Sequence, residues 1–206
     1  WIGTGPQLDG LGHVGDEDIF YNCNKGEDFS FITGLTKMGI EKIPPLVGRG
    51  VLINMAKHHG VSSMYGGQGI TREDIKKAIK KQNIELKKGD IILFHTGWTD
   101  AKLKSSPEEW GASIPGITND AAVYLSEFKP MAVGADTWGL GAVPPIEGDK
   151  VYYDHVTLIK ENGIYILETM DTGKLAKENV TEFMFVLGQP KLKGAVQMII
   201  NPVALW

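Results

Sequence analysis

Residues 71–94, TREDIKKAIKKQNIELKKGDIILF, contain the pattern that decides the fold class. Thr71 followed by Asp74 resembles a capping box, and the apolar residues after it recur at helical spacing, with lysines on the opposite face. The sequence KKGD at 87–90 then predicts a turn into a buried apolar strand at 91–94. The stretch therefore predicts an amphipathic helix followed by a buried strand.

Apolar runs of strand length recur on both sides of this stretch. The strands that we expect are 51–55, 91–94, 131–134, 164–167, 183–187 and 195–200. A further helix is expected to begin at Thr118, and 156–160 is expected to be a short helix or an extended piece. Strands interleaved with helices indicate an α/β fold. Since no repeat or linker interrupts the chain, residues 1–206 are predicted to form a single domain.

Composition and charge exclude several classes of protein. Lys and Arg number 21 and Asp and Glu 25, for a net charge of −4 without basic blocks, so we expect no nucleic-acid or membrane partner. No apolar run reaches the roughly 18 residues that span a bilayer. The single Cys23 excludes an internal disulfide framework and a multi-cysteine metal site. A small-molecule partner is the remaining expectation.

The chain begins at Trp1, with neither an initiator methionine nor a signal peptide. We therefore expect that an N-terminal portion is missing. No targeting signal can be read from such a beginning, so the cytoplasm is only the default expectation for the compartment.

Polar residues crowd a glycine-rich segment near the beginning of the chain. Gln7 and Asp9 are two residues apart, so in an extended segment both side chains point to one face. His13 follows beyond two glycines, which allow the loop to fold back. An amide oxygen, a carboxylate and an imidazole can converge on one divalent ion. The alternative is a turn in which Asp9 caps backbone amides and His13 lies on the surface.

A second polar cluster lies late in the chain. His155 follows Asp154 and opens a segment that runs to Gly163, and Glu168 ends the apolar run 164–167. A carboxylate that ends an apolar strand lies either in solvent at the sheet edge or in a cleft. The two interpretations are therefore a capping histidine with an edge glutamate, or a pair of site residues.

Other polar residues are interpreted as structural. Asp136 follows a buried strand and either supports a site or forms an Asx turn. His95 is expected to be a structural histidine with its hydrogen bonds satisfied, His58 and His59 surface residues, and Cys23 an inert thiol. Neither a G-x-S-x-G elbow nor a phosphate-binding glycine motif occurs, which argues against serine hydrolases of that type and nucleotide-binding folds.

Residues 3–13, GTGPQLDGLGH, resemble the signature H-x-G-T-H-x-D-x-P-x-H of the metal-dependent cyclase family. That family includes bacterial kynurenine formamidases, isatin hydrolases and zinc-dependent trans-dienelactone hydrolases. Gly5, Asp9 and His13 match the signature. The resemblance continues in order through 48–53, 96–98, 133–137, His155, Gly163, Ile164 and Glu168.

The sequence departs from this signature at several positions. Gly3 and Gln7 stand where the signature has its first two histidines, and Leu11 stands at the proline. Because two imidazole ligands are absent, we expect one metal ion rather than a binuclear site. The variant looks closer to the dienelactone hydrolases than to the formamidases.

The resemblance implies a cyclase-like swivelling β/β/α domain, in which a mixed sheet curls toward a barrel and helices flank it. It implies one divalent ion, Zn or Mn, held by Gln7, Asp9 and His155, with Glu168 as a further ligand or the partner of one. It also implies a homo-oligomer, either a dimer or a tetramer.

The activity implied is hydrolysis of a cyclic amide, a lactone or an aryl formamide by a water that the ion activates. His13 or Glu168 would transfer the proton, or His13 would be the third ligand and leave Glu168 as the main base. The alternative is a non-catalytic binding or storage protein on the same scaffold, with a degenerate metal site. Aromatic residues that either line a substrate pocket or belong to the core are Trp1, Phe20, Phe29, Phe31 and Trp138.

Overall fold

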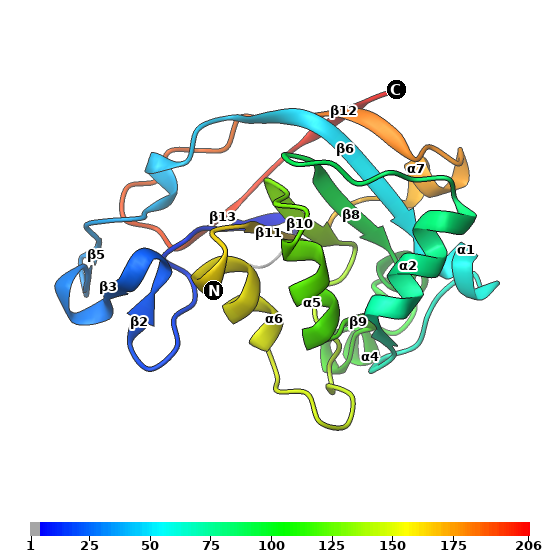
Figure 1. Ribbon diagram of the computed structural model, residues 1–206, viewed down its shortest axis with the longest axis horizontal. Helices are drawn as coiled ribbons and strands as arrows, with labels where there is room; N and C mark the ends of the chain where they lie inside the picture. Colours follow the sequence, from blue (N-terminus) through cyan, green and yellow to red (C-terminus); the bar gives the residue numbers. More distant parts are fainter. Residues whose placement is uncertain (1–4) are drawn as a thin grey trace.

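The computed structural model describes residues 5–206, so the expectations for Trp1 and Gly3 lie outside the described residues. One mixed sheet of eight strands is the centre of this part of the chain, and Figure 1 shows it curling, with β6 arching across one side. Its strands are β1 (Gln7–Asp9), β6 (Leu46–Asn54), β8 (Ile91–His95), β10 (Ala132–Ala135), β11 (Tyr165–Glu168), β12 (Glu182–Leu187), β13 (Gln197–Ile199) and β14 (Val203–Leu205).

The strand order is β13-β1-β11-β10-β8-β6-β12-β14. The four strands β11, β10, β8 and β6 are parallel, so their carboxyl ends lie along one edge, where Asn54 pairs with His95 and Glu168 ends β11. Strand β1 runs antiparallel to β11 and places Gln7 directly opposite Glu168. Residues from the two ends of the chain therefore meet at this carboxyl edge.

Helices and short strands fill the connections. The helices are α1 (Met55–His59), α2 (Arg72–Lys81), α3 (Trp98–Lys102), α4 (Pro107–Ala112), α5 (Asn119–Ser126), α6 (Tyr153–His155) and α7 (Gly173–Lys177). A π-helical segment, Val156–Glu161, continues α6, and single 3₁₀ turns occupy Tyr21–Cys23, Gly26–Asp28 and Ile40–Lys42. The remaining strands form two-stranded ribbons: β2 (Ile19–Phe20) with β3 (Asn24–Lys25), β4 (Ser30–Phe31) with β5 (Gly34–Leu35), and β7 (Gly69–Ile70) with β9 (Gly116–Ile117).

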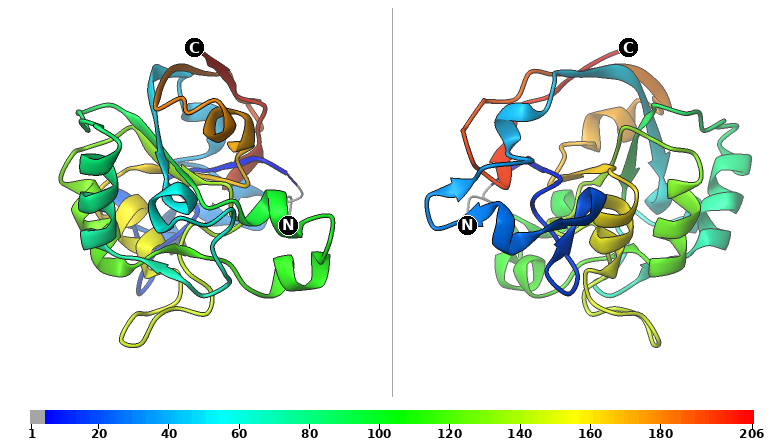
Figure 2. Two further views of the ribbon diagram at one scale, coloured as in Figure 1. Left: turned by 90° about the vertical axis from the view of Figure 1, so that its right-hand side faces the viewer. Right: turned by 60° about the vertical axis from the view of Figure 1, so that its left-hand side comes forward.

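Two hydrophobic cores pack against the two faces of the sheet. Val51 and Ile53 of β6 enter the core shared with α2 and α5, whereas Leu52 between them enters the other core. This follows from the alternation of side chains along a strand, and it explains why the parallel strands are apolar on both faces. Figure 2 shows α5 and α6 on the same side of the sheet, with the N-terminal ribbons lying beside α6.

The α/β fold predicted from the sequence is confirmed, including the mixed sheet that curls toward a barrel. The capping box is present in both directions, since the Thr71 side chain accepts from the Asp74 amide and the Asp74 carboxylate accepts from the Thr71 amide. The helix expected at Thr118 is α5, for which Thr118 is the N-cap residue. At 156–160 the chain is helical rather than extended.

Strand boundaries differ from the predictions by a few residues. Strand β6 is longer than 51–55 and ends at Asn54, because the Asn54 side chain accepts from the Lys57 amide at 2.8 Å and begins α1. The strand expected at 195–200 is the shorter β13. In the described part of the chain, no helix combines the length and apolar character that a membrane crossing requires.

Candidate metal centre

The pairing of β1 with its two neighbours brings the early and late polar clusters together. Gln7 lies opposite Glu168 of β11, and Asp9 lies opposite Gln197 of β13. Residues directly opposite in an antiparallel pair point to the same face, and so do residues two apart in one strand. Gln7, Asp9, Gln197 and Glu168 therefore share one face of the sheet, and Asp9 is fully buried there while Glu168 is 4% exposed.

Helix α6 adds His155 to this group. The His155 Nε2 atom lies 3.2 Å from Glu168 Oε1 and 3.8 Å from Asp9 Oδ2. Its Nδ1 atom lies 3.0 Å from Asp154 Oδ2. One possible ligand atom from each of Asp9, His155 and Glu168 thus lies within 4.8 Å of the others, and all three residues are buried. An imidazole oriented by a carboxylate through its other nitrogen is typical of metal-binding histidines.

The Asp9 carboxylate has one satisfied oxygen and one that lacks a partner. Oδ1 accepts from Gln197 Nε2 at 3.1 Å, whereas Oδ2 is buried without a hydrogen-bond partner among the described residues. Burying a carboxylate oxygen without a partner is costly, and buried charges are normally paired or coordinate metals. Two carboxylates and one imidazole around that oxygen fit a divalent cation such as Zn²⁺ or Mn²⁺.

The electrostatics of the cluster favour either protons or a cation. Burial and then the neighbouring Glu168 raise the pKa of Asp9 from 3.8 to about 6. Burial lowers the pKa of His155, but Asp154 and Glu168 outweigh it and raise that pKa well above 6.5. The group therefore holds protons that a divalent cation would displace on binding.

Gln7 contacts the cluster through its amide nitrogen. Nε2 donates to Glu168 Oε2, and Oε1 lies 3.4 Å from Gln197 Nε2. Ligation of a metal by the Gln7 oxygen therefore requires the side-chain amide to flip, so that Oε1 and Nε2 exchange places. The two orientations differ only in which hydrogen bonds they make. As it stands, Gln7 orients Glu168.

His13 lies at the margin of the cluster. Gly10 and Gly12 allow the chain to turn, with the His13 amide donating to the Gly10 carbonyl at 3.0 Å. A Cβ atom on Gly12 would lie 2.4 Å from Leu35 Cδ1, so a larger residue here requires the Leu35 side chain to move. His13 Nε2 is 3.9 Å from Asp9 Oδ1, and burial is the main cause of its lowered pKa. The imidazole is therefore mainly neutral at pH 7.

A cavity of about 310 Å³ opens onto these residues. It is lined by Gln7, His13, Val14, Trp138, Gly139, Tyr152, His155, Glu168 and Gln197. The Tyr152 ring lies edge-on to His155 at 5.6 Å between ring centroids, and the Trp138 indole donates to the Trp110 carbonyl at 2.7 Å. The cavity is thus lined by both polar and aromatic side chains.

Sequence reasoning overlooked Gln197 and Tyr152. Gln197 interrupts the apolar run 195–200, and only the pairing of β13 with β1 places it against Asp9. Tyr152 adopts a left-handed backbone conformation with φ 56°, which no local motif indicates.

The residues interpreted as structural lie outside the cluster. Asp136 accepts from the Thr96 amide at 2.9 Å and from the Gly97 amide at 2.8 Å, so it holds the turn after β8. His95 Nδ1 lies 2.8 Å from Thr172 Oγ1. Cys23 is an exposed free thiol.

The remaining candidates are divided between surface, core and cavity. His58 and His59 lie close to Asp74, with one possible ligand atom of each within 4.8 Å of the others. Among the aromatic candidates, Phe29 is in the core, Phe31 is half exposed, and Trp138 lines the cavity.

Comparison with known proteins gives consistent results. The family described as "Putative cyclase" matches residues 1–142, which include Gln7, Asp9 and His13 but not His155 or Glu168. A structure described as a novel cyclase is 28% identical, with a TM-score of 0.87 over 98% of this chain and 68% of that chain.

Two further solved structures share the fold at lower identity. Isatin hydrolase A from Labrenzia aggregata is 19% identical, with a TM-score of 0.70 over 98% of this chain and 72% of the other. A predicted metal-dependent hydrolase from Bacillus stearothermophilus is 20% identical, with a TM-score of 0.61 over 99% and 77%. Among curated proteins, none matches the sequence.

Proposed function

Because the chain belongs to the cyclase family, we propose that it is a metal-dependent hydrolase that opens a cyclic amide or lactone, or cleaves an aryl formamide. The observation that carries this proposal is the buried, unpartnered Asp9 Oδ2, which faces His155 Nε2 at 3.8 Å beside a cavity lined by both polar and aromatic side chains. Isatin hydrolases share the fold, which supports the hydrolysis of a ring.

Asp9, His155 and Glu168 are proposed to hold one divalent ion, Zn or Mn, with Gln7 adding its amide oxygen once the amide flips. Bound there, such an ion supplies Lewis-acid chemistry, since it polarises a carbonyl group and makes a water molecule more acidic at neutral pH. Asp154 keeps the imidazole of His155 in the tautomer that presents Nε2.

The proton transfers are assigned to His13. It lines the cavity, and its lowered pKa leaves it neutral and able to accept a proton from water at pH 7. It would then return the proton to the leaving nitrogen or oxygen. Glu168 is the alternative base if His13 binds the ion instead.

A second candidate function is a non-catalytic binding protein on the same scaffold. Gln7 stands at a histidine of the family signature, and its amide nitrogen contacts Glu168, which occupies one of the oxygens that a metal would use. In that case the cavity would bind a small molecule without turnover.

Under either function we propose that the chain forms a homo-oligomer, either a dimer or a tetramer. Light scattering on the purified chain would test this proposal.

Metal content and turnover separate these functions. The chain purified without chelator is expected to carry close to one divalent ion and to lose thermal stability in EDTA, because an ion that binds only the folded state stabilises it. It is expected to hydrolyse members of a panel of lactones, cyclic amides and formyl-anilines. Full hydrolase activity in a metal-free chain would overturn the mechanism, and indifference to EDTA without turnover would favour the binding protein.

A further inference from the structure

A second hollow lies at the carboxyl ends of β6 and β8, where it opens beside α1 and α7. It consists of two adjoining cavities of about 270 and 490 Å³, which share Asn54, Lys57 and Ala176. We call it the β6–β8 hollow. It has no lining residue in common with the cavity of the metal centre, and strand β10 separates β8 from β11.

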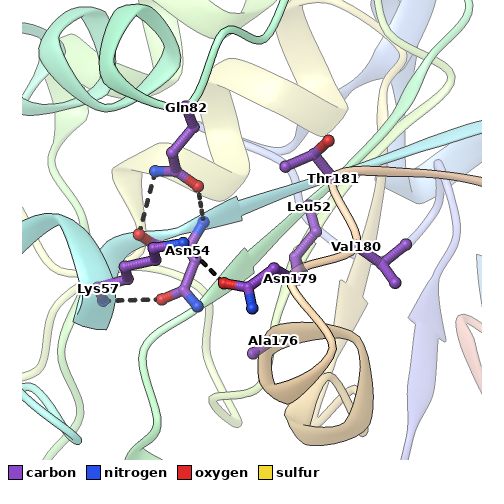
Figure 3. A pocket seen from close by; sticks show the side chains of 8 residues that line it. All are labelled: Leu52, Asn54, Lys57, Gln82, Ala176, Asn179, Val180 and Thr181. Carbon is purple, nitrogen blue, oxygen red and sulfur yellow. Dashed lines mark hydrogen bonds between the residues drawn. The ribbon is translucent and has the colours of Figure 1, made fainter.

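The walls of the β6–β8 hollow are fixed by hydrogen bonds (Figure 3). The Gln82 side chain accepts from the Asn54 amide at 3.0 Å and donates to the Asn54 carbonyl at 3.1 Å, so it binds the last residue of β6 beyond the residues that pair with β12. Lys57 Nζ donates to Asn179 Oδ1 at 2.6 Å and so links α1 to the segment after α7. Lys57 keeps two further N–H donors, and the Asn179 side-chain nitrogen remains free to donate.

His95 presents an unpartnered nitrogen to the hollow. The residue is 7% exposed and lines the larger cavity. Its Nδ1 atom bonds Thr172 Oγ1 at 2.8 Å and lies 3.8 Å from Asp136 Oδ2, whereas Nε2 has no hydrogen-bond partner among the described residues. A hydroxyl can donate to Nδ1 or accept from it, and when the Thr172 hydroxyl donates, Nε2 is free to donate to a ligand. His95 lines the larger cavity, and its Nε2 atom is not among the fully buried atoms that lack a partner, so a ligand in the hollow can reach it.

The charged residues that line the β6–β8 hollow have one sign. Lys57 and Lys177 line it together with His95, and none of its described lining residues carries a carboxylate, in a chain with 25 acidic residues. Glu178, which neighbours Asn179 in sequence, is engaged elsewhere, since its carboxylate accepts from the Trp206 indole at 2.9 Å. A concave surface lined by cationic groups and donors concentrates anions.

We propose that the β6–β8 hollow is a binding site for a small anion that carries a carboxylate or a phosphate group, held by Lys57, Lys177 and His95 Nε2. The larger of its two cavities, at about 490 Å³, has the size of small-molecule sites, which span roughly 300–1,000 Å³. The proposal is independent of the metal centre, because every residue that it uses lies outside that cavity.

Calorimetric titration of the full chain with inorganic phosphate and, separately, with succinate tests the proposal. At least one probe is expected to bind with a stoichiometry of one, and the difference between the two identifies the anionic group. Lys57→Gln and Lys177→Gln are each expected to weaken binding by about tenfold, because each removes a charge-assisted hydrogen bond. Lys80→Gln, which changes an exposed lysine on α2, is the matched control and should bind like the unaltered chain.

Nuclear magnetic resonance of ¹⁵N-labelled imidazoles provides a readout that does not depend on a variant folding. The Nε2 resonance of His95 is expected to shift as the probe saturates, while that of His155 stays in place. Asp9→Asn, which disables the metal centre, should leave anion binding unchanged, so the two proposals can fail separately. Absence of binding by both probes, or binding that neither lysine substitution weakens, would overturn the proposal.

Discussion

The metal centre and the β6–β8 hollow lie at the same edge of the sheet, but they differ in charge and in enclosure. The metal centre gathers two carboxylates and an imidazole that are all buried. The hollow gathers lysines and amides near the surface, with a buried histidine behind them. The comparison shows that both sites form at the carboxyl ends of the parallel strands, whereas the neighbouring segments decide the chemistry of each site. Strand β1 brings Gln7 and Asp9 to the metal centre, and helices α1 and α7 bring lysines to the β6–β8 hollow.

The largest effect is expected from Asp9→Ala, which removes the carboxylate at the centre of the metal cluster. Loss of an outer hydrogen-bond partner of a metal ligand already costs about 10–100-fold in metal affinity or activity, so the loss of a ligand should cost more than about 100-fold in both. Metal content and kcat/KM on a hydrolysed substrate measure the effect. The exposed Asp28→Ala is the control, and unchanged turnover in Asp9→Ala would remove Asp9 from the site.

The next effect concerns pH and is specific to the metal centre. In chelator-treated protein the pKa of Asp9 is raised to about 6 when folded, against 3.8 ordinarily, so the folded state binds this proton more tightly than the unfolded chain. The stabilisation is complete below about pH 4 and is lost as the pH rises through about 6, which corresponds to about 3 kcal/mol.

A loss of this size lowers the melting temperature by roughly 6–12 °C for a chain of this length. Thermal melts of the chelator-treated chain between pH 4 and 7 should show it relative to Asp9→Ala, in which this contribution is absent. Parallel pH profiles for the two proteins would contradict the prediction.

A smaller effect is expected from Asp154→Asn, which leaves all three candidate ligands in place. The Asp154 carboxylate fixes His155 through a 3.0 Å contact, and its loss should weaken metal binding by about 10–100-fold. Titration with zinc in the presence of a competing chelator measures this. A metal affinity equal to that of the unaltered chain would show that His155 needs no orienting partner.

The smallest effect sharpens the comparison itself. Lys57→Gln removes a lysine of the β6–β8 hollow, which shares no lining residue with the metal centre. Metal content and kcat/KM should therefore stay within about twofold of the unaltered chain, since sites without shared partners are usually independent. A large fall in turnover would show that the two regions are coupled.

Several features of the site could be predicted because they depend on neighbours along the chain. The spacing of Gln7 and Asp9 indicated a shared face, and the apolar run before Glu168 indicated a carboxylate at the end of a strand. The orientation of the Gln7 amide could not be predicted, because it depends on Glu168 and Gln197, which lie 161 and 190 residues further along the chain.

The sequence by itself determined the α/β class, the capped helix after Thr71, the family resemblance and the candidate ligands Gln7, Asp9, His155 and Glu168. These are local patterns, because capping and side-chain alternation act over a few residues. Only the tertiary structure decided that β1 lies between β11 and β13, which sets Gln197 against Asp9, and that α1 and α7 enclose a hollow without carboxylates. Such contacts join distant segments whose pairing depends on how the whole sheet assembles, and no local pattern encodes it.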